Sequence, residues 1–139
     1  MASFQAGEYL SWTYQADRLM ADLLSSPNRH TRRLVRADVE HFRHWLQMRR
    51  LPAESLPLML AILSSRGFED VQALVAEYVA WQQQRGYRAS TINRRLCTLR
   101  AVSRLMRQMG TTGWDLSTVQ NVRSTDNVLR VSAEAEVAA

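Results

Sequence analysis

Apolar residues recur at steps of three and four through most of the chain, which is the spacing of an amphipathic helix. The clearest case is the segment 30–49, whose apolar residues are Leu34, Val35, Val39, Phe42, Trp45 and Leu46. Only three prolines and five glycines interrupt the 139 residues, so there is room for long helices. No segment alternates apolar and polar residues as a half-buried strand does. The sequence therefore predicts an all-α protein.

Turn residues divide the chain into the helices that we expect. The predicted helices span residues 8–24, 30–49, 58–63, 68–85 and 90–109, and a shorter one is expected over 114–122. Ser90 is a suitable N-cap for the helix that it opens, while Gly86 and Gly110 are placed to end helices. We expect one domain over residues 1–122, with 8–24 as an extra N-terminal helix, and a tail or linker over 123–139.

The segment from Arg85 to Arg107 carries seven arginines, and no acidic residue stands between Glu77 and Asp115. All 18 basic residues of the chain are arginine, and its net charge is +5. A guanidinium can form two parallel hydrogen bonds to a phosphate or a guanine edge, which an ammonium cannot. A genome rich in G and C would also deplete lysine, but it would not remove the acids. A polyanion is therefore the expected partner.

The helix expected over 90–109 has one apolar and one polar face when its residues are placed about 100° apart. Its core-facing residues are Ile92, Leu96, Leu99, Val102 and Met106. The opposite face holds Ser90, Arg94, Thr98 and Ala101, flanked by a stripe of Asn93, Cys97, Arg100, Arg104 and Arg107. Small side chains among the arginines would let this helix enter a major groove, and Ser90 and Thr91 suit a phosphate. The alternative is a solvated cationic face, but such faces usually mix both signs of charge.

The helix expected over 30–49 also begins with basic residues. Its first acid is Asp38, and before it come Arg29, His30, Thr31, Arg32, Arg33 and Arg36. Each arginine at a helix start opposes the helix dipole by about 0.3–1 kcal/mol at most. A docked anion would offset this cost. Two basic helix starts joined by a core suggest a clamp on a nucleic-acid backbone.

These residues resemble the core-binding domain of the tyrosine recombinases (phage integrases), with an arrangement closest to the Cre-like branch. The resemblance rests on Arg85-Gly86, on Ser90-Thr91-Ile92-Asn93-Arg94-Arg95-Leu96 and Leu99-Arg100, and on His30-Thr31 with Phe42 and Trp45. It covers roughly residues 31–110. It implies a small orthogonal bundle of four to six helices that forms half of a C-shaped clamp around double-stranded DNA. It also implies contacts with other protomers in a DNA-bound synaptic assembly.

The resemblance also implies which residues contact DNA. By position, these are Arg32, Arg33, Leu34 and Arg36 on the earlier helix and Ser90, Arg94 and Thr98 on the later one. The basic stripe and the start of the later helix add Arg88, Thr91, Asn93, Arg100 and Arg104.

The chain departs from the family's pattern in three ways. The segment 51–67 is longer than the family's usual link, and the Asn-Pro that often follows the last basic helix is absent. The family's chemistry uses a tyrosine nucleophile with arginines and histidines, yet no tyrosine follows Tyr87 and no histidine follows His44. We therefore expect a chain that directs a recombinase to DNA but does not cut DNA by itself, and that needs no cofactor.

Other kinds of site find less support in the sequence. His41 and His44 lie one helical turn apart without a His-Glu-x-x-His motif, so we expect no metal, and Cys97 has no histidine near it. No segment has the features of a signal peptide or a membrane span, which predicts a cytoplasmic protein with no membrane or small-molecule partner. The alternative function is a helical interaction module that binds an acidic protein through its cationic faces. Its working surface would then be the apolar segment Leu56–Leu63 and the C-terminal tail.

Overall fold

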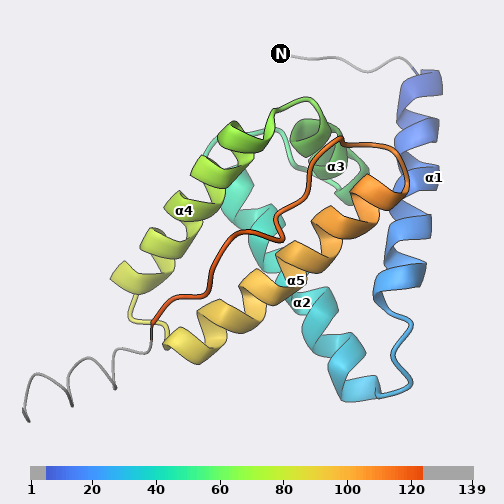
Figure 1. Ribbon diagram of the computed structural model, residues 1–139. Helices are drawn as coiled ribbons and strands as arrows, with labels where there is room; N and C mark the ends of the chain where they lie inside the picture. Colours follow the sequence, from blue (N-terminus) through green and yellow to red (C-terminus); the bar gives the residue numbers. More distant parts are fainter. Residues whose placement is uncertain (1–5, 124–139) are drawn as a thin grey trace, which may run out of the picture.

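The computed structural model describes residues 6–123, and 71% of these residues are helical, with no strand among them. The helices within this range are α1 (Ala6–Leu23), α2 (Arg29–Met48), α3 (Leu56–Ser64), α4 (Phe68–Gln84) and α5 (Ala89–Gln108) (Figure 1). The predicted all-α bundle of four to six helices is confirmed. The tail expected over 123–139 lies outside the described residues except for Arg123.

Helix α5 lies at the centre of the bundle and packs against α1, α2 and α4. Figure 1 shows α5 crossing α2 rather than running alongside it. The α5 side chains predicted to face the core, from Ile92 to Met106, are all buried. This agreement follows from the strict apolar spacing of the helix, which leaves only one side able to enter the core.

An aromatic group joins α2 to α4 in the middle of the core. Phe42 and Trp45 of α2 contact the fully buried Tyr78 of α4, with ring centroids 5.0 and 5.1 Å from that of Tyr78. Aromatic pairs at such distances add roughly 0.5–1.5 kcal/mol each beyond the area that they bury. This group therefore fixes how α4, and the turn that follows it, sits relative to α2.

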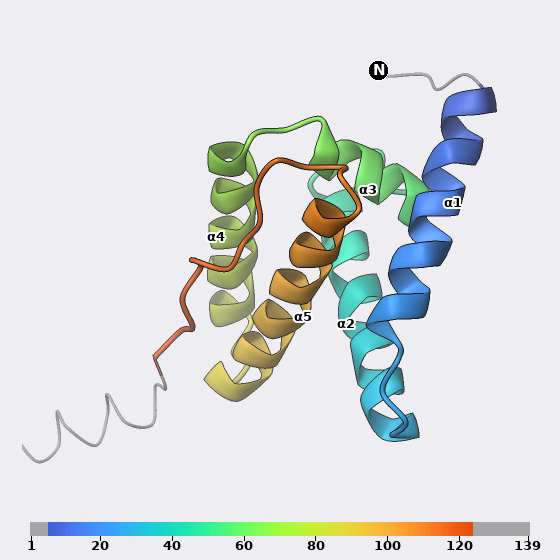
Figure 2. The same cartoon turned by 45° about the vertical axis from the view of Figure 1, so that its right-hand side comes forward.

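Helix α1 flanks the bundle on one side and packs against α3 and α5 (Figure 2). Its Ala16 and Leu19 are buried in the common core, so this extra helix shares the core of the others. Helix α3 is almost wholly apolar, and Met59, Leu60, Ala61 and Leu63 are buried. Half of the segment Leu56–Leu63, which the alternative function would use as a working surface, is therefore buried inside the protein.

Helix boundaries depend on local capping groups. The Asn28 side chain accepts hydrogen bonds from the amides of His30 and Thr31, at 2.9 and 3.2 Å, and so opens α2 at Arg29. The expectation that Ser90 caps α5 is wrong, because Arg88 holds the cap position and Ser90 is already inside the helix. No side chain caps this start.

The prediction of a helix over 114–122 is also wrong. Residues 111–123, here called the C-terminal strap, contain no helix and run back along α5 from its end towards its start (Figures 1 and 2). Buried Leu116 holds the strap on the core, and its amide donates to the Ser103 hydroxyl of α5 at 2.8 Å. Side chains of α5 form hydrogen bonds with backbone groups of the strap, which in a helix would have been paired with each other.

Within residues 6–123, no helix combines the length and the apolar character needed to cross a membrane.

Gly86 ends α4 with a φ of +81°, a conformation that side chains bearing a Cβ rarely adopt. We expect Gly86→Ala to lower the free energy of unfolding by about 1 kcal/mol, although a Cβ there would meet no neighbouring atom. Gly113→Ala is the matched control, because that site has open space without a positive φ, and its stability should change little. Urea unfolding of both variants would measure this, and equal stabilities would contradict it.

Candidate nucleic-acid interface

The two basic helix starts open at the same end of the bundle. In both views the first turns of α2 and α5 lie in the lower part of the molecule, α2 on the right and α5 on the left, and the last turn of α4 lies above the start of α5 (Figures 1 and 2). We call this the basic end, and its arginines are Arg29, Arg32, Arg33 and Arg36 of α2 and Arg85 and Arg88 of the turn between α4 and α5. The fold thus places two basic segments that are about fifty residues apart in sequence on the same side of the molecule.

Most of the α2 arginines at this end are free. Arg29, Arg33 and Arg36 are exposed and form no hydrogen bond or ion pair through their side chains with the described residues. Arg32 is half-buried, and its guanidinium donates to the Ser26 carbonyl at 2.8 Å, which ties down the loop before the helix. Leu34 is also half-buried, so it offers less surface than the arginines beside it.

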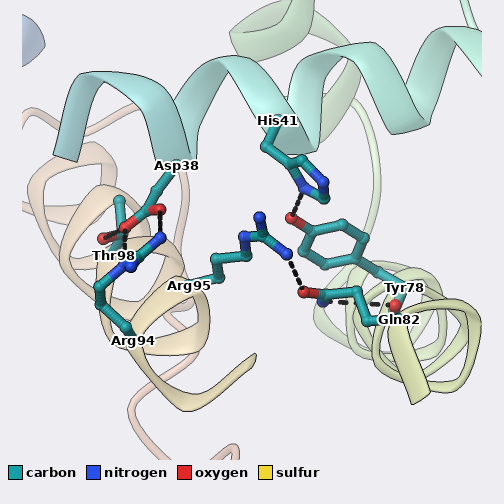
Figure 3. Close-up of polar contacts among 7 residues, drawn as sticks. All are labelled: Asp38, His41, Tyr78, Gln82, Arg94, Arg95 and Thr98. Carbon is teal, nitrogen blue, oxygen red and sulfur yellow. Dashed lines mark hydrogen bonds and ion pairs between the residues drawn. The ribbon is translucent and has the colours of Figure 1, made fainter. Parts of the chain in front are cut away.

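An ion pair between Asp38 and Arg94 joins α2 to α5 where the two helices cross (Figure 3). The Arg94 Nη2 and Nε atoms lie 2.8 and 3.3 Å from the two Asp38 carboxylate oxygens, and the Thr98 hydroxyl donates to the same carboxylate at 3.0 Å. Asp38 is only 2% exposed, whereas the Arg94 side chain is 41% exposed. The hydrogen bond to Asp38 raises the pKa of Arg94, which therefore stays charged.

The prediction that Thr98 lies on an open outer face is wrong, because it is 7% exposed. Its hydroxyl points at Asp38, since the side of α5 opposite the apolar core is partly covered by α2. Arg94 stands on the predicted face, but part of its hydrogen-bonding capacity is already used within the protein.

A second polar cluster lies between α2, α4 and α5, and the sequence did not predict it (Figure 3). The Arg95 guanidinium donates to the Gln82 amide oxygen at 2.8 Å and stacks over the Tyr87 ring, with its central carbon 4.5 Å from the ring centroid. His41 Nδ1 lies 2.6 Å from the Tyr78 hydroxyl. The sequence signal for this cluster was Gln82, a glutamine at an apolar position of its helix. Gln82 is fully buried in the structure, and a buried amide needs a polar partner.

Burial lowers the pKa of His41, and the nearby Arg95 charge lowers it further. Burial also raises the pKa of Tyr78, so its hydroxyl keeps its proton. A neutral imidazole can therefore accept, at Nδ1, the hydrogen bond that Tyr78 donates. The cluster links α2 to α4 and α4 to the start of α5 through hydrogen bonds that involve no acidic residue.

The C-terminal strap pairs with three residues of the stripe that flanks the outer face of α5. Asn93 pairs with the backbone of Val122 in both directions, at 2.9 and 2.7 Å. Arg100 donates to the Val119 carbonyl at 2.9 Å and to the Asn121 side chain at 2.8 Å. Arg107 forms an ion pair with Asp115 at 3.1 Å. Asn93 and Arg100, both predicted to contact DNA, thus hold the strap.

The remaining predicted contacts on α5 differ in their exposure. Arg88, Ser90 and Arg104 are exposed, while Thr91 is half-buried. The side chains of Arg88 and Arg104 form no hydrogen bond or ion pair with residues 6–123. The accessible part of the predicted site is therefore concentrated at the start of α5, together with Arg33 and Arg36 of α2.

Comparisons of the chain with protein-family models, with curated proteins and with solved structures found no match. The resemblance to recombinases therefore stays a prediction. Among the residues that the structure describes, no group of three or more histidine, cysteine or acidic side chains is placed to hold a metal ion.

Removing Arg94 should destabilise the fold, because it leaves the Asp38 carboxylate buried without its cation. Breaking a fully buried pair costs about 3–5 kcal/mol, and water reaching the half-exposed Arg94 position should reduce this to about 2 kcal/mol for Arg94→Ala. Arg36→Ala, which removes an exposed arginine, should change stability by less than about 0.5 kcal/mol. Adding Asp38→Asn to Arg94→Ala should recover part of the loss, since no charge then remains buried. Equal unfolding midpoints for Arg94→Ala and Arg36→Ala would refute this role.

The lowered pKa of His41 should make stability depend on pH. The unfolded chain protonates His41 near pH 6.5, whereas the folded protein does so only at lower pH, so the unfolded state binds more protons in between. The contribution of His41 to stability should therefore be present above pH 6.5 and be lost as the pH falls below 6.5 towards the lower pKa of the folded protein. His41→Gln should flatten this dependence, while His30→Gln, at an exposed position of the same helix, should leave it unchanged. Urea unfolding at each pH provides the measurement.

Proposed function

We propose that this chain binds double-stranded DNA through its basic end, as the core-binding module of a site-specific recombinase. One observation carries the proposal: two helix starts open at one end of the bundle, with five exposed arginines that form no ion pair with the described residues. These arginines are Arg29, Arg33, Arg36, Arg85 and Arg88. Unpaired guanidiniums gathered at one end favour a polyanion over ordinary solvation, because solvated helix faces usually carry compensating acids.

The rigid link between the two starts supports binding to a regular duplex. Asp38 and Arg94 hold α2 and α5 together close to these starts, so the separation of the charges is set before any ligand arrives. Charges that are already in position lose less conformational entropy on binding. A helix fits the major groove with its first residues near the base edges, while neighbouring arginines contact phosphates.

The recombinase part of the proposal rests on the resemblance of residues 85–100 and of the start of α2 to core-binding domains. Cutting and rejoining DNA would belong to another part of the polypeptide or to another chain, since no tyrosine follows Tyr87 in this sequence. The role of this domain would be to hold the DNA in place and to contact neighbouring protomers.

DNA binding can be tested by fluorescence anisotropy with a mixed-sequence duplex of about 30 base pairs, at 50 to 200 mM salt. We expect a dissociation constant of roughly 10⁻⁴–10⁻⁶ M for a non-specific duplex and a steep salt dependence. Arg33→Ala should weaken binding and lower the slope of log K against log salt by about 1. Arg49→Ala removes the same charge at the opposite end of α2 and should leave the slope unchanged.

Two results would overturn this assignment. Absence of binding at 50 mM salt would reject DNA as the ligand. Equal weakening by Arg33→Ala and Arg49→Ala would show that net charge alone drives binding, without a defined site. Arg94→Ala is not suitable for this test, because it also removes the partner of buried Asp38.

A second candidate function is binding of an acidic protein. The exposed side chains of Tyr9, Leu10 and Tyr14 on α1 favour a protein contact, since they form an apolar surface outside the core. On this alternative, affinity for duplex DNA would not increase with duplex length. Duplexes of about 12 and 30 base pairs in the same assay separate the two functions, because a DNA-binding domain gains overlapping sites on the longer duplex.

A further inference from the structure

A hollow at the basic end is lined by two arginines that lie 35 positions apart in the sequence. Arg88, just before α5, and Arg123, at the end of the C-terminal strap, both line this space of about 300 Å³. Tyr87, Ala89, Ile92 and Val122 form other parts of its wall. The sequence did not predict a role for Arg123, because the return of the strap to this end is visible only in the fold.

The position of Arg123 is fixed by side chains of α5. Asn93 makes two hydrogen bonds with the backbone of Val122, the residue just before Arg123, at 2.9 and 2.7 Å. Arg100 of α5 donates to the carbonyl of Val119 and to the side chain of Asn121, which precede Val122 in the strap. These four hydrogen bonds bring the end of the strap to the start of α5.

The hollow is suited to an anion. Neither Arg88 nor Arg123 forms a side-chain hydrogen bond or an ion pair with the described residues, and none of the described residues that line the hollow is acidic. Asp115, the acid of the strap, is paired with Arg107 instead. The space equals the volume of about ten liquid waters, which is enough for a hydrated phosphate group. Because Arg88 and Arg123 both line this space, their guanidiniums are within reach of a phosphate there and can bind its oxygens through charge-assisted hydrogen bonds.

We propose that this hollow is a phosphate subsite, in which Arg88 and Arg123 hold one phosphate of a bound duplex. This inference rests on the proposed DNA binding and extends it, because it adds the strap to the surface that contacts the backbone. Asn93 is then a positioning residue: it touches no phosphate but keeps Arg123 beside Arg88. A free phosphate ion has the same chemistry and is the other possible occupant.

The test uses the same duplex assay with the full chain. Arg123→Ala should weaken binding and lower the salt slope by about 1, because one phosphate contact is lost. Asn93→Ala should have a similar effect although it removes no charge, since it releases the end of the strap. Arg49→Ala again serves as the charge-matched control. Thermal unfolding should show that Arg123→Ala is folded, because that side chain is exposed.

A titration with inorganic phosphate separates the two sources of phosphate. Amide chemical shifts of residues 87–89 should change saturably in the wild-type chain and much less in Arg123→Ala. This result would support the subsite even if the wild-type chain failed to bind duplex DNA, a failure that would count against the proposed function alone.

Two outcomes would overturn the subsite. If the wild-type chain binds DNA but Arg123→Ala and Asn93→Ala bind equally well, the hollow contacts no phosphate, while the proposed function stands. If Asn93→Ala binds DNA more tightly than the wild type, the strap instead covers a surface of α5 that the duplex would otherwise reach.

Discussion

A carboxylate buried between two helices sets the geometry on which the basic end depends. Withdrawing Asp38 from water costs several kcal/mol, and the cost is offset only while Arg94 and Thr98 keep their hydrogen bonds to it. Apolar packing alone tolerates small sliding and rotation of one helix on another, whereas a paired carboxylate requires a particular register. The crossing of α2 and α5, and with it the separation of their basic starts, is therefore defined by polar contacts that belong to the interior.

Helix α5 combines two tasks, packing of the core and display of positive charge. It supplies much of the core through Ile92, Leu96 and Leu99, and it also carries five arginines. These arginines have different roles: Arg94 and Arg95 join helices, Arg100 and Arg107 hold the strap, and Arg104 is open to solvent. A high density of positive charge on a helix is thus a poor guide to how much of it remains available to a ligand.

The sequence predicted the helices and the apolar face of α5 because both depend on short-range periodicity, which the chain follows strictly. Prediction from the sequence failed where contacts with a distant segment determine the burial or the conformation of a residue. Spacing assigned Thr98 to the outside, but α2 covers it, and the segment 114–122 was given a helix although side chains of α5 pair its backbone. The cluster of His41, Tyr78, Gln82 and Arg95 was missed for the same reason, since its members come from three helices.

The strap is held to α5 partly through its own main chain. Asn93 and Arg100 bind backbone groups of Val122 and Val119, so these contacts do not depend on which side chains the strap carries there. At positions 119 and 122, where Val119 and Val122 pack against the core, other apolar side chains would be tolerated as long as the α5 partners remain. The information that specifies the path of residues 117–123 is thus encoded about twenty to thirty residues earlier in the chain, and two otherwise dissimilar strap sequences could follow one route.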